Sequence, residues 1–131
     1  MKILKRISEV DFEYNYNEKT NYIVIRTHTP IRLRALAPNY LNTYCEYEKI
    51  TYYSYKNCFA TDDPYETTAK IPAFGDFYLK ENFPEVYNLF EKEVESLTNK
   101  DVSYRGSIRY IFEVDNEIFT LLKAHLDLIY L

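Results

Sequence analysis

The side chains best suited to acid–base, nucleophilic or metal chemistry are few in this chain and lie far apart. Its 131 residues include two histidines, His28 and His125, and two cysteines, Cys45 and Cys58. Zinc sites are built from closely spaced ligand pairs, and these four residues form none. No nucleophile signature surrounds either cysteine. We therefore expect no catalytic residue and no metal site, and the sequence favours a non-catalytic protein over an enzyme.

Phosphate cofactors and metal-dependent hydrolysis leave other signatures, and these are also missing. Phosphate-cradling loops need several glycines, and the whole chain has two. The paired acids Asp62 and Asp63 precede Pro64, which is typical of a turn. No lysine stands two positions after an acid, a spacing found in many metal-dependent nucleases. No cofactor is therefore expected.

Charge is distributed unevenly along the chain, although the net value of −4 is modest. Five acids and one base lie between positions 81 and 95. We name the acids the acidic ridge: Glu81, Glu85, Glu91, Glu93 and Glu95. Such a ridge attracts a basic surface on a partner protein. Tyr78 and Tyr87 are the nearest rings in sequence, and we predict that they anchor this partner.

A second candidate surface combines arginine and tyrosine. The segment 19–45 holds four basic residues and no acid, and a tyrosine-rich segment follows it. Together they could form a stacking and charge platform for single-stranded nucleic acid. Its members would be Arg26, Arg32, Arg34, Tyr52, Tyr53 and Tyr55. Tyrosine-rich strands with solvated arginines explain the same residues, and the sequence leaves both explanations open.

A single α+β domain spanning residues 1–131 must position these surfaces. Apolar residues make up 47% of the chain, which is ample for a packed core. Short runs of alternating polarity predict an antiparallel sheet of about five to six strands. The strands before the middle of the chain are expected within 3–16, 22–27, 31–36 and 46–57.

One helix and one long loop are predicted next. Pro84 suits a first helical turn, so we predict one main helix over 84–98, packed on one face of the sheet. Its apolar residues recur at helical spacing: Val86, Phe90, Val94 and Leu97. Residues 60–79 are rich in turn formers and predict a surface loop. In an enzyme acting on a small substrate, this loop would be the lid.

The end of the chain carries the clearest strand pattern. Apolar and polar residues alternate over 108–114, and Asp115-Asn116 suits a tight turn. We therefore predict a terminal β-hairpin over about 107–123. Residues 124–131 fit either a strand or a helix, and we favour a continued strand with a short irregular or helical end.

This terminal segment resembles the terminal hairpin of RelE/ParE-type toxins. The resemblance rests on the run from Ser107 through Phe112, on His125 and on the pair Ile129-Tyr130. It covers about a fifth of the chain. In ribonuclease members of that family the late histidine can act in RNA cleavage. The resemblance therefore implies an RNA-binding or RNA-cleaving protein in which His125 belongs to the site.

A protein-binding function is favoured over the other classes. We expect a small inhibitor or immunity-type protein that blocks a nucleic-acid-processing enzyme, such as a nuclease with a basic surface. A composition low in glycine and rich in Asn, Tyr, Lys and Ile is typical of phage or mobile-element products with anti-defence roles. The alternatives are an RNA-binding or RNA-cleaving protein and a small-substrate enzyme.

Signals for export or membrane insertion are missing from the sequence. The segment MKILKRISEV has no apolar h-region, and no window approaches ~20 consecutive apolar residues. Two cysteines outside the CxxC spacing are typical of reduced thiols. We therefore expect a cytoplasmic protein that does not associate with membranes.

Overall fold

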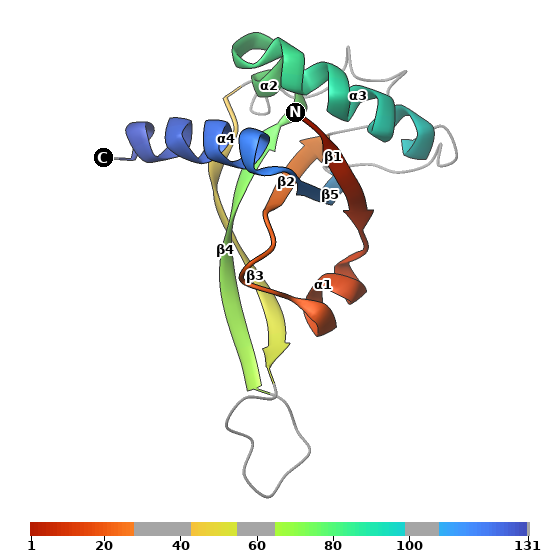
Figure 1. Cartoon of the computed structure of the whole chain (residues 1–131), viewed down its shortest axis with the longest axis vertical. Coiled ribbons are helices and arrows are strands. Elements are labelled where there is room, and N and C mark those ends of the chain that lie inside the picture. The colour runs from red at the N-terminus through yellow and green to blue at the C-terminus, as the bar shows by residue number, and fades with distance from the viewer. Residues whose placement is uncertain (28–42, 55–64, 99–107, 131) are drawn as a thin grey trace, which may run out of the picture.

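A computed structural model of the chain describes residues 1–27, 43–54, 65–98 and 108–130, and leaves out the side chains of 94–98. In chain order its elements are β1 (Ile3–Ile7), α1 (Glu9–Asn15), β2 (Tyr22–Thr27), β3 (Cys45–Ser54), β4 (Tyr65–Gly75), α2 (Asp76–Asn82), α3 (Pro84–Thr98), β5 (Ile108–Val114) and α4 (Asn116–Ile129). The five strands form one sheet, and helices cover it (Figure 1). The predicted α+β class is confirmed, whereas the predicted strand over 31–36 lies outside the described residues.

The sheet is mixed, and the prediction of a purely antiparallel sheet is wrong. Its strand order is β1-β5-β2-β4-β3. Three of the neighbouring pairs are antiparallel, but β2 and β4 run parallel, with Val24 opposite Ala73. Alternating polarity identifies a strand and the face that it buries, but it does not specify which strand lies beside it. The direction of β4 is therefore a tertiary property.

The second half of the predicted terminal hairpin is also wrong. β5 matches the expected strand, but α4 follows it directly. Asp115 is the helix N-cap, because its carboxylate accepts a hydrogen bond from the Ile118 amide at 3.0 Å. Ile118, Leu122 and Leu126 recur every fourth residue and are all buried. One helical face is thus fully apolar, which decides for a helix through Ile129 instead of a continued strand.

Residues 9–15, predicted as part of a strand, form the short helix α1. Ser8 caps this helix, since its hydroxyl accepts a hydrogen bond from the Asp11 amide at 3.1 Å. Phe12 is the buried residue of α1, at 1% exposure. A seven-residue helix that buries a single large side chain shows too little periodicity to be told from a strand.

The predicted loop over 60–79 is wrong from residue 65 onward. β4 occupies the sheet between β2 and β3, and α2 begins at Asp76. Ala69, Ile71 and Ala73 alternate along β4 and are buried. Pro72 lies inside this strand. Because proline usually marks a turn, its presence led to the wrong prediction of a loop. Residues 65–79 therefore do not form the predicted lid loop. Residues 60–64 lie outside the described residues.

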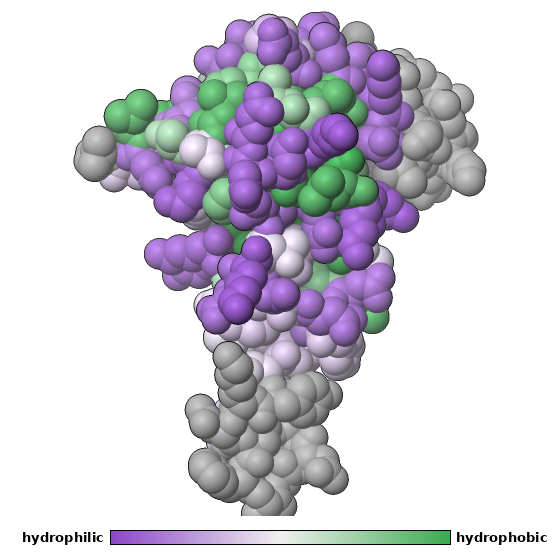
Figure 2. Space-filling view, in the orientation of Figure 1, coloured by the Kyte–Doolittle hydropathy of each residue, from purple (hydrophilic) through white to green (hydrophobic). Residues whose placement is uncertain are grey.

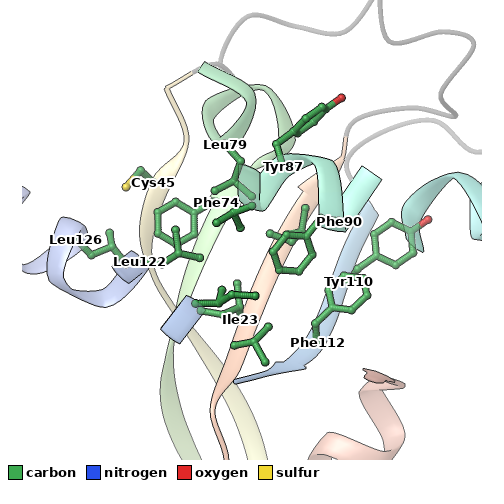
Figure 3. Close-up of a cluster of buried hydrophobic side chains, with 14 residues drawn as sticks. Ile23, Cys45, Phe74, Leu79, Tyr87, Phe90, Tyr110, Phe112, Leu122 and Leu126 are labelled. Atoms are coloured by element: carbon green, nitrogen blue, oxygen red, sulfur yellow. The ribbon is translucent and has the colours of Figure 1, made fainter. Parts of the chain in front are cut away.

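The predicted helix over 84–98 is confirmed as α3, but the prediction of one main helix is wrong, because α2 and α4 also pack on the larger face of the sheet among the described residues. Val86 and Phe90 are buried at 1% exposure, and the Phe90 ring meets Phe112 edge-on at 5.1 Å. Leu79 of α2 and the apolar face of α4 complete this cluster (Figure 3). The side chains of Val94 and Leu97 lie outside the described residues.

The opposite face of the sheet carries a second, smaller core. Phe12 of α1 packs there against Tyr22 and against buried residues of β2, β3 and β4. β3 and β4 extend beyond the rest of the sheet as a two-stranded ribbon (Figure 1). Among the described residues, none of the helices combines the length and apolar character needed to cross a membrane.

Candidate functional site

Two pairs of tyrosine rings from distant segments meet where the end of α1 reaches the edge strand β3. Tyr14 and Tyr16 come from the C-terminal end of α1, and Tyr52 and Tyr53 come from β3. Tyr14 stacks on Tyr53 with ring centroids 5.0 Å apart and planes 27° apart. Tyr16 lies 4.2 Å from Tyr52. The rings therefore hold each other in defined positions before any ligand arrives.

These rings line a hollow of about 410 Å³, which we name the tyrosine cleft. Its lining residues are Tyr14, Tyr16, Asn17, Glu18, Tyr52, Tyr53 and Ser54. Where β3 and β4 leave the body of the protein, the surface has intermediate hydropathy, while the helices above are mostly hydrophilic (Figure 2). Concave surfaces with aromatic walls and a few polar groups are the usual form of binding sites.

The charge around the tyrosine cleft is negative. Burial raises the pKa of Tyr16, and the neighbouring Tyr52 and Glu18 raise it further. The charge of the Glu66 carboxylate is the main cause that raises the pKa of Tyr53. Burial and the charge of Glu13 raise this pKa further. Glu66 lies directly opposite Tyr53 in the β3–β4 pair. No lysine or arginine lines the cleft among the described residues.

A network of charged side chains connects the start of α1 to the sheet. Glu48 of β3 is buried at 7% exposure and accepts hydrogen bonds from Arg26 Nε at 2.6 Å and from the Tyr44 hydroxyl at 2.5 Å. Arg109 of β5 lies 3.6 Å from the second Glu48 oxygen and 2.8 Å from the Glu9 carboxylate. Since Glu9 begins α1, this network helps to hold the helix that carries Tyr14 and Tyr16.

The network keeps Glu48 ionised. Burial alone would raise the pKa of Glu48, but hydrogen bonds from Arg26 and Tyr44 and the charges of Arg26 and Arg109 outweigh it, so its pKa is lowered. Burial, together with hydrogen bonds to Glu48 and Glu46, raises the pKa of Tyr44. The tyrosine therefore stays protonated as a donor, and the carboxylate stays charged as an acceptor. This arrangement is suited to structure and not to proton transfer near neutral pH.

The residues predicted for a nucleic-acid surface are only partly together. Tyr52 and Tyr53 line the cleft, and Arg26 is engaged with Glu48. His125 lies on α4, on the opposite face of the sheet, where its ring contacts Tyr78 and meets Phe83 edge-on at 4.9 Å. Arg32, Arg34 and Tyr55 lie outside the described residues.

The acidic ridge lies on the helices of the larger face, away from the cleft. Three of its members are exposed: Glu81, Glu85 and Glu93. Glu91 is half-buried and accepts a hydrogen bond from the Tyr87 hydroxyl at 3.3 Å. The side chain of Glu95 lies outside the described residues.

The two rings predicted to anchor a partner beside the ridge are largely used inside the protein. Tyr87 is only 7% exposed and belongs to the core, so little of its ring can contact a partner. Tyr78 is half-buried, and its hydroxyl contacts His125. The ridge therefore offers charge without an exposed aromatic anchor at these two positions.

Tyr14 and Tyr16 were not among the predicted site residues, because their segment was assigned to a strand. One signal could have found them. Ser8 followed by Asp11 is a helix N-terminus pattern, and a helix starting there places Tyr14 and Tyr16 at its end. Their approach to β3, at the other edge of the sheet from β1, has no signal in the sequence.

Metal binding finds no support in the described part of the chain, where no group of three or more His, Cys, Asp or Glu side chains could hold an ion. Comparison with known proteins gives no match to a family model, to a curated protein or to a solved structure.

Proposed function

We propose that this protein is a non-catalytic binding module that holds a partner protein in the tyrosine cleft. The observation that carries the proposal is the two packed pairs of tyrosine rings, Tyr14 with Tyr53 and Tyr16 with Tyr52, around an open hollow of about 410 Å³. Tyrosine supplies a large contact area at low entropic cost and is enriched in binding surfaces. Rings fixed before binding reduce that cost further.

The partner is best matched by a basic protein surface. Glu18 lines the cleft, and Glu13 and Glu66 act on the Tyr53 ring. On the other face of the sheet, the acidic ridge adds exposed negative charge. Such charges speed the encounter with a basic partner and fix its orientation. An inhibitor or immunity-type protein that occupies the substrate groove of a nuclease, as in phage anti-defence, fits these features.

The proposal is tested by affinity capture with matched variants. The tagged wild-type protein is used as bait in cell extract, and each recovered protein is then tested in purified form. Tyr14→Ala combined with Tyr53→Ala removes the stacked pair of the cleft. Tyr130→Ala is the control, because Tyr130 is 58% exposed at the end of α4 and does not line the cleft. Its hydroxyl donates a hydrogen bond at 2.9 Å to the Cys45 carbonyl, at the opposite end of β3 from Tyr52 and Tyr53. Circular dichroism is used to check that each variant is folded.

We expect a partner that binds the wild type and the Tyr130→Ala variant with the same affinity and binds the cleft variant at least about tenfold more weakly, since two interface rings contribute more than 1.4 kcal/mol. A partner that binds all three proteins equally would mean that the interface lies elsewhere, and the acidic ridge would then be the surface to test.

Binding of single-stranded RNA is the second candidate, because the exposed parts of Tyr52 and Tyr53 could stack on bases. The carboxylates around the cleft oppose it, since they repel phosphates. We expect no retention of single-stranded RNA on the immobilised protein, even at low salt. Retention that weakens steeply with salt and is lost in Tyr53→Ala would favour RNA over a protein partner.

A further inference from the structure

We propose that the tyrosine cleft recognises an arginine side chain of the partner protein. This inference rests on the proposed function and names the group that enters the site. It is carried by two features found together: aromatic walls from α1 and β3, and the Glu18 carboxylate, with Glu66 opposite Tyr53 and no lysine or arginine in the described lining.

The aromatic walls select for a flat cation. The face of a tyrosine ring attracts a cation placed over it, most strongly where water is partly excluded. Tyr14 is 52% exposed, so a ligand can reach its ring, while Tyr53 supports it from behind at 5.0 Å. Tyr16 and Tyr52, 4.2 Å apart, form the adjoining wall. A guanidinium group can stack on such a ring, whereas an ammonium group cannot.

The carboxylates near the cleft favour a positively charged group and fix the orientation of its N–H groups. Glu18 lines the cleft beside Tyr16, and Glu66 lies opposite Tyr53 in the β3–β4 pair. A guanidinium group that stacks through its face keeps its N–H groups free at the edge, where they can bond to these carboxylates. An anionic group would be repelled, and a neutral group would leave the charge of these carboxylates uncompensated. Arginine is the amino acid that satisfies both walls and rim.

Arg26 shows the same pairing of arginine with tyrosine and glutamate inside the protein. Arg26 bonds to Glu48 at 2.6 Å, and its guanidinium lies 5.9 Å from the centre of the Tyr44 ring. Tyrosine and glutamate therefore already hold one arginine on this face of the sheet. In the cleft the same residue types come together, and the lining supplies no arginine of its own.

The test compares two small probes that differ in charge and share nearly the same shape, N-acetyl-arginine methylamide and N-acetyl-citrulline methylamide. Binding to the full chain is followed through the tyrosine ring signals in proton–carbon correlation spectra. The signals of the four cleft rings are assigned by Tyr→Phe variants. We expect the arginine probe to shift these signals and to bind about tenfold more tightly than the citrulline probe, because the latter loses both the cation–π contact and the ion pair.

Variants place this binding in the cleft. Tyr14→Ala should weaken the arginine probe several-fold, and Glu18→Gln about threefold, as expected for an exposed ion pair. Tyr130→Ala, outside the cleft, should leave the affinity unchanged. Equal binding of the two probes, or no shift of the cleft rings by the arginine probe, would overturn the inference.

The two proposals can fail separately. A partner that is lost in the Tyr14→Ala and Tyr53→Ala variant, combined with no preference for the arginine probe, would leave the proposed function standing and overturn arginine recognition. A partner that binds independently of the cleft would overturn the proposed function, whatever the probes show, and would remove the partner's arginine from the cleft.

Discussion

Glu48→Gln provides the sharpest test of how the cleft is held in place. Glutamine keeps the size of the side chain but loses its charge. Arg26 and Tyr44 now donate to Glu48 over 2.6 and 2.5 Å, and Arg109 lies 3.6 Å away. In the variant, two guanidinium groups lose their buried counter-charge. Only water can then replace this counter-charge, and water reaches only the exposed part of each arginine side chain.

The magnitude follows from the burial of each partner. Removing one member of a buried ion pair costs about 3–5 kcal/mol. Glu48 itself is buried, with 6% of its side chain exposed, but the Arg26 and Arg109 side chains are 26% and 27% exposed and keep part of their hydration. We therefore expect a loss of about 2–3 kcal/mol in the free energy of unfolding at pH 7, close to the value of one or two charged hydrogen bonds.

Urea unfolding followed by circular dichroism measures this loss. Glu46→Gln is the matched control, because Glu46 is exposed, lies two residues away on β3 and accepts one hydrogen bond from Tyr44 at 2.9 Å. We expect less than about 1 kcal/mol for this variant. If Glu48→Gln costs no more than Glu46→Gln, the network does not stabilise the fold and our account of how α1 is positioned is wrong.

The same variant makes a prediction about pH. The pKa of Glu48 is lowered in the folded protein, so its contribution to stability is complete above the unfolded pKa near 4.5 and is lost as the pH falls through the folded pKa. The difference in stability between the wild type and Glu48→Gln should therefore be largest at neutral pH and shrink below about pH 4. A difference that is the same at pH 3 and pH 7 would contradict the assignment of a charged Glu48.

Three further predictions test other parts of the fold. Phe90→Ala should lower the free energy of unfolding by about 3–5 kcal/mol in urea titrations, since the Phe90 ring is 1% exposed and packs on Phe112; an unchanged value would mean that the buried face of α3 is misassigned. Asp115→Ala should cost about 1 kcal/mol through the lost N-cap of α4, and no cost would contradict the capped helix. Glu81→Lys with Glu85→Lys should leave the circular dichroism spectrum intact and slow association with a basic partner several-fold at low salt, as followed by stopped-flow or surface plasmon resonance; an unchanged rate would mean that the acidic ridge does not steer binding.

The sequence alone determined the helices and strands in which the spacing of apolar residues fits only one type of element. Pro84, followed by Val86 and Phe90 at helical spacing, predicts α3 with the bounds that the structure has. Alternation over 108–114 predicts β5 in the same way. In each case the period of the apolar residues equals the period of the element and no turn former interrupts it.

Where the sequence pattern fits both a strand and a helix, tertiary packing decides which of the two forms. Asp115 suits both a hairpin turn and a helix N-cap, and the following residues fit both periods in part. Ile118, Leu122 and Leu126 lie against the larger face of the sheet, where a helix buries all three. The burial of three large side chains outweighs the weaker local preference for a strand.

The tyrosine cleft depends on tertiary structure most of all. Tyr14 and Tyr53 are far apart in the chain, and β1 and β3 form opposite edges of the sheet. The four rings meet because α1 follows β1 and lies across the second face until its end contacts β3. The tyrosines and carboxylates were visible in the sequence as residue types. Their convergence follows from the strand order, which long-range packing sets and which no local periodicity encodes.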